Sequence, residues 1–164
     1  MPHDRIILIG YRGTGKTTVG RLLAADLGWG FADCDVRVEE IAGMPILGIF
    51  AAEGEAGFRD REAAALQDLC GRPGHVIATG GGAILRSGNR ELARASGFVA
   101  WLTASPETVW GRLRTDPTTA TRRPNLTSAG GIEEVRALNA AGEPLYRKTA
   151  DFAVETDAAS PEAV

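Results

Sequence analysis

Residues 10–17 read GYRGTGKT, which matches the pattern GxxxxGK[ST] and follows a short apolar run. Glycines at these positions let backbone N–H groups curl around phosphate oxygens, and a helix beginning next would add the positive end of its dipole. Lys16 supplies a point charge for the β- and γ-phosphates of a nucleotide, and the hydroxyl of Thr17 is a ligand for Mg²⁺. Chance produces the four fixed positions in roughly one chain in a few hundred, so we predict a nucleotide-binding loop.

Acidic residues and glycines follow the next two apolar runs. Asp33 and Asp35 come after one of them, and Thr79 precedes three glycines at 80–82 after the other. Because open α/β sheets bind ligands at the carboxyl ends of their strands, all of these residues are expected to face the phosphates. Carboxylate oxygens suit Mg²⁺, and a carboxylate can also accept the proton of an attacking hydroxyl.

The elements that must hold these residues alternate along the chain. Short apolar runs predict strands at about 6–9, 31–33, 75–79, 98–102 and 152–154. Helical spacing or a helix-opening pattern predicts helices over about 19–27, 36–41, 58–69 and 132–138, and from 105 and 160 onward. The stretch 115–131 is rich in Thr, Pro and Gly, which predicts a mobile loop. The alternation predicts a parallel α/β sheet with helices on both faces.

Composition narrows the class of protein. The 164 residues are 44% hydrophobic and 24% charged, which fits one globular domain. The net charge of -3 predicts no broad basic face for nucleic acid or lipid, and no apolar run approaches the ~20 residues of a membrane span. Cys34 and Cys70 lack metal-ligand spacing and are expected to be buried thiols. With no signal-peptide pattern, we predict a cytoplasmic protein, and one small nucleotide-binding domain favours a small-molecule kinase over a GTPase or motor.

The chain resembles the shikimate kinase family through motifs that occur in the family's order over nearly its whole length. The shared motifs are Gly10–Thr18, Asp33-Cys34-Asp35, Phe58-Arg59, Gly80-Gly81-Gly82, Arg123-Pro124 and Pro144-Leu145-Tyr146. The resemblance implies a three-layer α/β/α P-loop kinase fold with a five-stranded parallel sheet in the order 2-3-1-4-5. It also implies a single domain over 1–164, with its core at 1–34, 70–111 and 145–164, a substrate-binding region at about 35–69 and a lid at about 112–130.

The same resemblance implies the reaction, in which ATP with Mg²⁺ phosphorylates the 3-hydroxyl of shikimate by in-line transfer. ATP would be bound by Arg12, Gly13, Thr14, Gly15, Lys16, Thr17, Thr18, Arg112 and Arg123. Shikimate would be bound by Asp35, Arg59, Gly80, Gly81 and Gly82, and Mg²⁺ by Thr17 and Asp33. The catalytic residues would be Lys16, Asp35 and Arg123. The implied partners are small molecules alone, without nucleic acid or membrane, and the implied assembly is a monomer.

These residues have implied roles and, except for Arg123, an alternative interpretation. Asp35 would take the acceptor's proton, or it caps the helix that follows it. Arg59 would bind the acceptor's carboxylate as a fork, or it is a solvated helix charge paired with Glu55 or Glu62. Arg112 would stack on adenine, or it is simply solvated. Arg123 would stabilise charge on the transferring phosphoryl group. The glycines at 80–82 would admit the acceptor ring, or they form a plain turn.

Position 142 departs from the family pattern. The family carries an arginine two residues before Pro-Leu-Tyr, where it makes a second contact to the substrate's carboxylate, and this chain has Gly142. We expect Gly142 to end one helix and Pro144 to begin the next. Losing one charge-assisted contact costs about 1.5–3 kcal/mol. Either Arg136 or Arg147 compensates, or the acceptor pocket has changed, or the enzyme is weak.

Two further hypotheses are compatible with a phosphate loop. A gluconate-type or other polyol kinase would keep the chemistry and change the acceptor, which Gly142 favours and the paired aspartates and triple glycine oppose. A non-catalytic ATP-binding paralogue would bind ATP without turnover. The retention of Lys16, Asp35 and Arg123 opposes that hypothesis, because binding alone does not require all of them.

Overall fold

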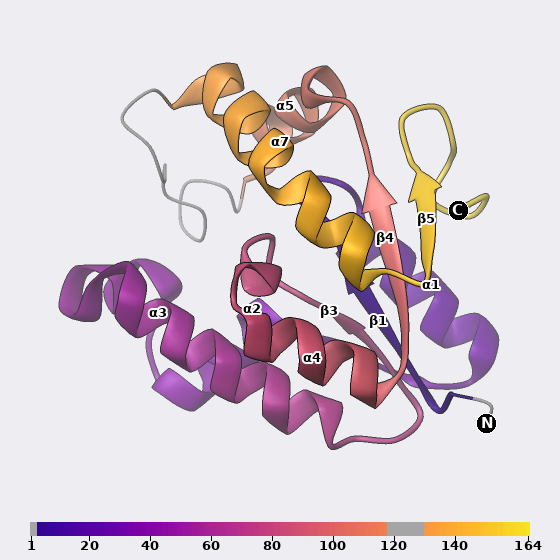
Figure 1. Cartoon of the computed structure of the whole chain (residues 1–164), viewed down its shortest axis with the longest axis horizontal. Helices are drawn as coiled ribbons and strands as arrows, with labels where there is room; N and C mark the ends of the chain where they lie inside the picture. Colours follow the sequence, from indigo (N-terminus) through magenta and orange to yellow (C-terminus); the bar gives the residue numbers. More distant parts are fainter. Residues whose placement is uncertain (1–2, 118–129) are drawn as a thin grey trace.

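The computed structural model describes residues 3–117 and 130–164, which form a three-layer α/β/α arrangement (Figure 1). The strands are β1 (Arg5–Ile9), β2 (Gly30–Asp33), β3 (His75–Ala78), β4 (Phe98–Thr103) and β5 (Phe152–Glu155). The helices are α1 (Lys16–Leu27), α2 (Cys34–Ala42), α3 (Ile46–Cys70), the 3₁₀ turn η1 (Ala83–Leu85), α4 (Ser87–Ser96), α5 (Pro106–Thr115) and α7 (Gly131–Thr149). All paired strands are parallel and their order is β2-β3-β1-β4-β5, which confirms the predicted sheet.

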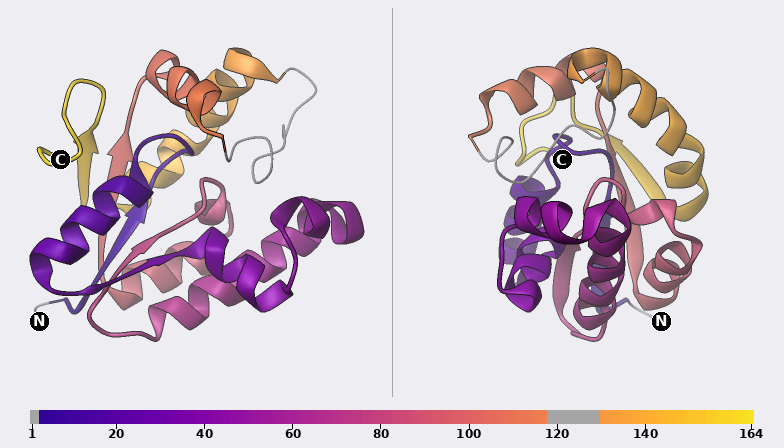
Figure 2. Two further views of the ribbon diagram at one scale, coloured as in Figure 1. Left: turned by 180° about the vertical axis from the view of Figure 1, so that it is seen from behind. Right: turned by 90° about the vertical axis from the view of Figure 1, so that its left-hand side faces the viewer.

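Alternate residues of each strand face different helical layers, because side chains along a strand point to opposite sides of a sheet. Ile7 and Ile9 of β1 join the larger apolar cluster, which includes side chains of α2, α3, α4 and α7. Leu8, between them, packs with Val19 and Ala24 of α1 on the opposite face. The left view of Figure 2 shows α1 in front of the sheet, on the side turned away in Figure 1.

The central position of β1 explains why the predicted site residues meet. β1 pairs with β3 on one side and β4 on the other, with Leu8 opposite Ala78 and Ile9 opposite Trp101. β2 pairs with the far side of β3. The loops that leave β1, β2 and β3 therefore start at neighbouring points along one edge of the sheet, as the strand-end rule predicts.

Two helices differ from the sequence-based expectation. α3 begins at Ile46, whereas helical spacing predicted a helix only over 58–69. Gly54, with φ 70° and ψ −172°, breaks the helical path inside it, so the spacing does not continue across this point. α7 runs unbroken through Gly142 and Pro144, so the predicted helix break there is wrong. Packing of α7 against β4, η1 and α4 outweighs the local cost of an interior proline, about 3 kcal/mol.

Other predicted elements either agree with the structure or lie outside the described residues. Ser105 accepts a hydrogen bond from the backbone N–H of Thr108 and so caps α5, as predicted. The helix expected from residue 160 is a single turn, in which Ala163 and Val164 donate to the carbonyl of Ser160. The predicted loop at 115–131 falls mostly outside the described residues. η1 and α4 were not predicted.

The length and apolar composition of a helix determine whether it could span a membrane. Within residues 3–117 and 130–164, no single helix has both the length and the apolar composition needed to cross a bilayer. The helices α2 and α3, which meet at an angle of 92°, reach the required length and apolar composition only when they are counted as one segment.

Candidate active site

The predicted phosphate loop connects β1 to α1. Gly15, directly before α1, has φ 99°, a left-handed conformation that favours glycine. The Thr14 hydroxyl donates to the carbonyl of Tyr11 at 2.8 Å, which closes the loop on itself. The buried Lys16 donates through Nζ to the carbonyl oxygens of Gly10 (2.6 Å) and Tyr11 (2.9 Å). The loop therefore presents an ammonium group and a helix N-terminus at one place, which suits a nucleotide's phosphates.

Thr17 and Asp33 are in direct contact. The Thr17 hydroxyl donates to Oδ2 of Asp33 at 2.9 Å. Oδ1 of the same carboxylate accepts from the backbone N–H groups of Asp35 (2.9 Å) and Val36 (3.3 Å). Asp33 is thus the cap of α2, and the alternative interpretation of Asp35 as that cap is wrong. The cap fixes the Asp33 carboxylate, which in turn fixes the Thr17 hydroxyl.

This pair of oxygens suits Mg²⁺. Nucleotide enzymes hold Mg²⁺ through one or two protein oxygens together with phosphate oxygens, so a dense cluster of acidic ligands is not required. The described part of the chain has no group of three His, Cys, Asp or Glu side chains placed to hold a metal. A hydroxyl that donates its hydrogen to Asp33 keeps its oxygen lone pairs for a cation. Thr18, the next residue of α1, is exposed.

Arg112 joins α5 to the phosphate loop. Its Nη1 donates to the carbonyl of Gly13 and to the Thr156 hydroxyl, both at 3.1 Å, and its Nη2 donates to the Thr156 carbonyl at 2.8 Å. The Thr156 hydroxyl also lies 3.1 Å from the carbonyl oxygens of Thr14 and Thr103. Arg112 is therefore bonded to the protein beside the nucleotide loop, which contradicts the interpretation of a merely solvated arginine.

A cavity of about 330 Å³ opens beside the phosphate loop. One part of its wall is apolar and is formed by Ile46, Phe50, Phe58, Leu85 and Leu138. Another part is polar and is formed by Arg12, Asp35, Glu55, Arg59, Glu62 and the glycines at 80–82. The predicted acceptor residues thus line one cavity, and Tyr11 and Arg12 connect it to the phosphate loop.

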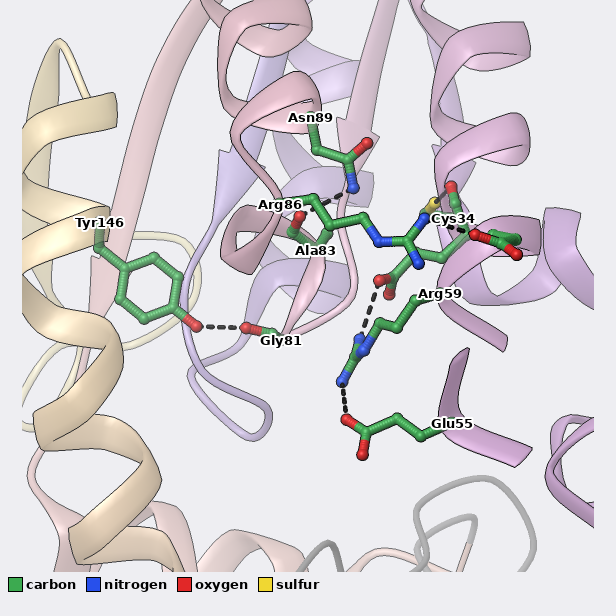
Figure 3. A network of polar contacts seen from close by, with 10 residues as sticks. Cys34, Glu55, Arg59, Gly81, Ala83, Arg86, Asn89 and Tyr146 are labelled. Carbon is green, nitrogen blue, oxygen red and sulfur yellow. Dashed lines mark hydrogen bonds and ion pairs between the residues drawn. The ribbon is translucent and has the colours of Figure 1, made fainter. Parts of the chain in front are cut away.

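Arg59 is buried and held by two glutamates of its own helix. Only 9% of the residue is exposed. Its Nη1 donates to Glu62 at 2.8 Å, and its Nη2 lies 3.6 Å from Glu55 (Figure 3). The guanidinium also lies over the Phe58 ring, 5.2 Å from its centroid. The predicted glutamate pairing is confirmed, while the interpretation as an exposed charge is wrong.

Glu62 is the carboxylate that sequence reasoning named only as an ion-pair partner. It is 1% exposed, and its burial is the main reason that its pKa is raised to about 7. The nearby Asp35 raises that pKa further, while Arg59 opposes the shift. The i, i+3 spacing from Arg59 was the available signal for the contact, but nothing in the sequence indicated the burial.

The glycines at 80–82 are needed because neighbouring groups occupy the space that side chains at these positions would require. None of them has a positive φ, so a turn alone does not require glycine there. A β-carbon on Gly80 would lie 3.1 Å from Oδ1 of Asp35 and closer still to the Glu62 carboxylate. A β-carbon on Gly82 would lie 2.5 Å from Nη2 of Arg59. The plain-turn interpretation is therefore insufficient, because side chains here would displace the polar groups of the cavity.

Tyr146 connects α7 to the same loop. Its hydroxyl donates to the carbonyl of Gly81 (Figure 3), and its ring stacks on Trp101 with centroids 5.7 Å apart. Burial raises the pKa of the Tyr146 hydroxyl, which keeps it a donor. A β-carbon on Gly142 would lie 2.9 Å from Cε2 of this ring, so the ring occupies the space that a side chain at position 142 needs.

The two arginines named as one alternative to the missing arginine at position 142 lie elsewhere. Arg136 pairs with Glu107 and Glu133, and Arg147 pairs with Glu143 and lies over the Trp101 ring. Neither lines the cavity. Arg123 falls outside the described residues, so its predicted role stays a prediction.

Similarity to known proteins identifies the family of this chain. The family model described as "Shikimate kinase" matches residues 12–164. The chain belongs to the shikimate kinase family. The shikimate kinase of Rhodopirellula baltica is 48% identical over 153 residues, covering 93% of this chain and 82% of the relative. That of Neisseria gonorrhoeae is 48% identical over 154 residues, covering 94% and 88%.

Solved structures agree with the family assignment. A structure described as shikimate kinase from Acinetobacter baumannii in complex with shikimate superimposes with a TM-score of 0.90, at 39% identity over 98% of this chain and 87% of that one. A sugar kinase from Janibacter matches with a TM-score of 0.56 at 18% identity, which shows a shared fold alone. The predicted family, fold and ATP-dependent kinase class are confirmed.

Proposed function

We propose that this shikimate kinase family member transfers the γ-phosphate of ATP to the 3-hydroxyl of shikimate, giving ADP and shikimate 3-phosphate. The observation that carries the proposal is the single cavity that places Asp35 and Arg59 beside the phosphate loop. An acceptor whose hydroxyl meets Asp35 and whose carboxylate meets Arg59 fits that arrangement. Shikimate, a ring acid with hydroxyl groups, has both features, and a relative of known structure binds it.

The proposed step is an in-line displacement at the γ-phosphorus. A bond forms between the acceptor oxygen and the γ-phosphorus, and the bond from that phosphorus to the β–γ bridging oxygen breaks. Asp35 accepts or orients the acceptor's proton, and Lys16 stabilises negative charge on the phosphates. Arg123, outside the described residues, is proposed to stabilise the transferring group. Gly13, Thr14, Gly15, Thr18 and Arg112 complete the proposed ATP site.

Recognition of the acceptor is assigned to Arg59 and the glycines. Arg59 is proposed to bind the carboxylate as a fork, which is the geometry that makes a guanidinium more selective than an ammonium. Glu62 and Glu55 hold this guanidinium in place. The backbone of residues 80–82, which lines the cavity and carries no side chains of its own, is proposed to contact the acceptor ring.

Thr17 and Asp33 are the proposed residues for Mg²⁺. Their hydrogen bond brings two hard oxygen ligands together next to the phosphate loop. When bound, the ion neutralises charge on the β- and γ-phosphates. The cap that Asp33 provides to α2 keeps this pair aligned. The division into core, substrate-binding region and lid, the monomeric state and the cytoplasmic location also stay predictions.

The test is ADP release from MgATP, coupled to a spectroscopic readout, with and without shikimate, for the parent and for Asp35→Asn. We expect shikimate-dependent turnover in the parent and a fall of about 10²- to 10⁴-fold in the variant. ATP binding, measured by calorimetry, should be unchanged in Asp35→Asn, which separates a lost base from a lost fold.

The alternatives give different results in the same assay. ADP release that depends on gluconate or another polyol, and not on shikimate, would establish a polyol kinase. ATP binding with no acceptor-dependent ADP release for any of these acceptors would support the non-catalytic paralogue and overturn the proposal.

A further inference from the structure

A second arginine lines the acceptor cavity from the nucleotide side. Arg12 belongs to the phosphate loop, yet its side chain borders the cavity together with Asp35 and Arg59. A β-carbon on Gly81 would lie 3.0 Å from the backbone nitrogen of Arg12, so the two loops are in contact at this point. Arg12 therefore lies where the cavity borders the phosphate loop.

Glu134 of α7 holds the Arg12 side chain. Nη2 of Arg12 donates to Oε2 of Glu134 at 2.8 Å, with the two side chains 12% and 1% exposed. Glu134 lies in the first turn of α7, where the positive end of the helix also stabilises a carboxylate. A guanidinium carries five donors and can serve a positioning carboxylate and a ligand carboxylate together.

One face of α7 brings these groups to the cavity. Glu134, Leu138, Ala141 and Gly142 are spaced at i, i+4, i+7 and i+8, so they share a face of the helix. Leu138, Ala141 and Gly142 line the cavity. Position 142 itself has no room for a side chain because the Tyr146 ring fills that space. Among the described residues that line the cavity, the positive charges are those of Arg59 on α3 and Arg12, which Glu134 connects to α7.

We propose that Arg12 is a specificity-determining residue that binds the acceptor's carboxylate together with Arg59, and that Glu134 positions it. This inference rests on the proposed function. It assigns Arg12 to the acceptor, whereas its place in the phosphate loop had assigned it to ATP. Arg136 and Arg147 face other partners and have no part in it.

The test compares the KM values for shikimate and for ATP in the parent and in Arg12→Met. We expect the KM for shikimate to rise about 10- to 100-fold while the KM for ATP changes less than about twofold. With shikimate methyl ester as acceptor, which lacks the negative charge, the two proteins should have similar KM values. Arg136→Met and Arg147→Met are the matched controls and should resemble the parent.

Arg12→Met removes an ion-pair partner of the buried Glu134, so Arg12→Met/Glu134→Met is measured beside it. The double variant removes both charges and should show the same rise in the KM for shikimate. Glu134→Gln should show a smaller rise, because its amide can still accept a hydrogen bond from Arg12. Circular dichroism and ATP binding confirm that each variant is folded.

The outcomes separate this inference from the proposed function. A parent without shikimate-dependent turnover would overturn both. If the parent turns over shikimate, then an unchanged KM for shikimate in Arg12→Met overturns the role of Arg12 alone. A rise in the KM for ATP instead, or an equal rise with the methyl ester, also overturns it, since either result places Arg12 on the phosphates or in a purely structural role.

Discussion

Gly82 and Arg59 are in such close contact that a β-carbon on the glycine would lie 2.5 Å from Nη2 of the arginine. The arginine cannot retreat easily, because Glu62, Glu55 and the Phe58 ring surround its guanidinium. The space beside the buried Arg59 guanidinium of α3 is therefore limited by Gly82, which lies in the loop after β3. Gly82 therefore controls the space available to the arginine that is proposed to bind the acceptor.

Gly82→Ala should weaken acceptor binding through Arg59. The added methyl group displaces the guanidinium, so we expect the KM for shikimate to rise about tenfold, with the KM for ATP unchanged. Steady-state kinetics with each substrate varied in turn measures both values. Gly88→Ala is the matched control, since a β-carbon there meets nothing within 4 Å. Equal kinetics for Gly82→Ala and Gly88→Ala would contradict the prediction.

Thr17→Val should reduce the apparent affinity for Mg²⁺. The change removes the hydroxyl that contacts Asp33 and keeps a similar shape, so we expect a loss of about 10- to 100-fold. Titration of ADP release with Mg²⁺ at fixed ATP measures it. Thr17→Ser keeps the hydroxyl and should stay near the parent. Since Asp33 still caps α2 in both variants, their thermal stabilities should match, and a large drop in Thr17→Val would point to a structural effect.

Glu62 should make stability fall as the pH rises. Its folded-state pKa of about 7 exceeds the ordinary value of 4.5, so the folded protein holds the proton more tightly than the unfolded chain. The contribution is fully present below about pH 4.5 and is lost as the pH rises through 7. Between pH 5 and 8 we expect this group to lower the free energy of unfolding by on the order of 2 kcal/mol.

Urea unfolding of the parent and of Glu62→Gln at pH 5 and pH 8 tests the effect of Glu62. The variant lacks the titrating group, so its free energy of unfolding should fall less between the two pH values than that of the parent. Groups that do not interact with Glu62 contribute equally to both proteins. A parallel pH dependence would show that Glu62 titrates at an ordinary pKa.

Gly142→Arg should fail to add a useful charge to the cavity. Any β-carbon there meets the Tyr146 ring at 2.9 Å and disturbs its contacts with Gly81 and Trp101. We expect a loss of about 1–3 kcal/mol in the free energy of unfolding and no fall in the KM for shikimate. Gly142→Ala carries the same steric change without charge and should also be destabilised, despite the better helix propensity of alanine. A lower KM in Gly142→Arg would contradict this account.

The parts of the site that the sequence predicts are those encoded by local pattern. A β-branched run followed by GxxxxGK[ST] determines β1, the loop and the start of α1, and the strand-end rule brings Asp33 and Asp35 to the same edge. The sheet order followed from the family resemblance. These features need only residues close together in the sequence, or a topology shared by many chains.

Features that depend on tertiary packing were missed. A charged residue is usually exposed, so nothing local to Arg59 or Glu62 indicated that both are buried. Pro144 normally interrupts a helix, and only the packing of α7 explains why it does not do so here. The pairing of Arg12 with Glu134 joins residues 122 positions apart, a separation over which periodicity carries no information.

The hydrogen bonds of Thr156 have a consequence for how the protein folds during its synthesis. This residue follows β5 and contacts the phosphate loop through Thr14, 142 positions earlier in the chain. On the ribosome, the loop emerges long before the residue that anchors it has been translated. ATP stabilises a protein only to the extent that it binds the folded form. Cellular ATP can therefore support a nascent chain that already includes Thr156, whereas a fragment that ends before Thr156 lacks this anchor for the loop.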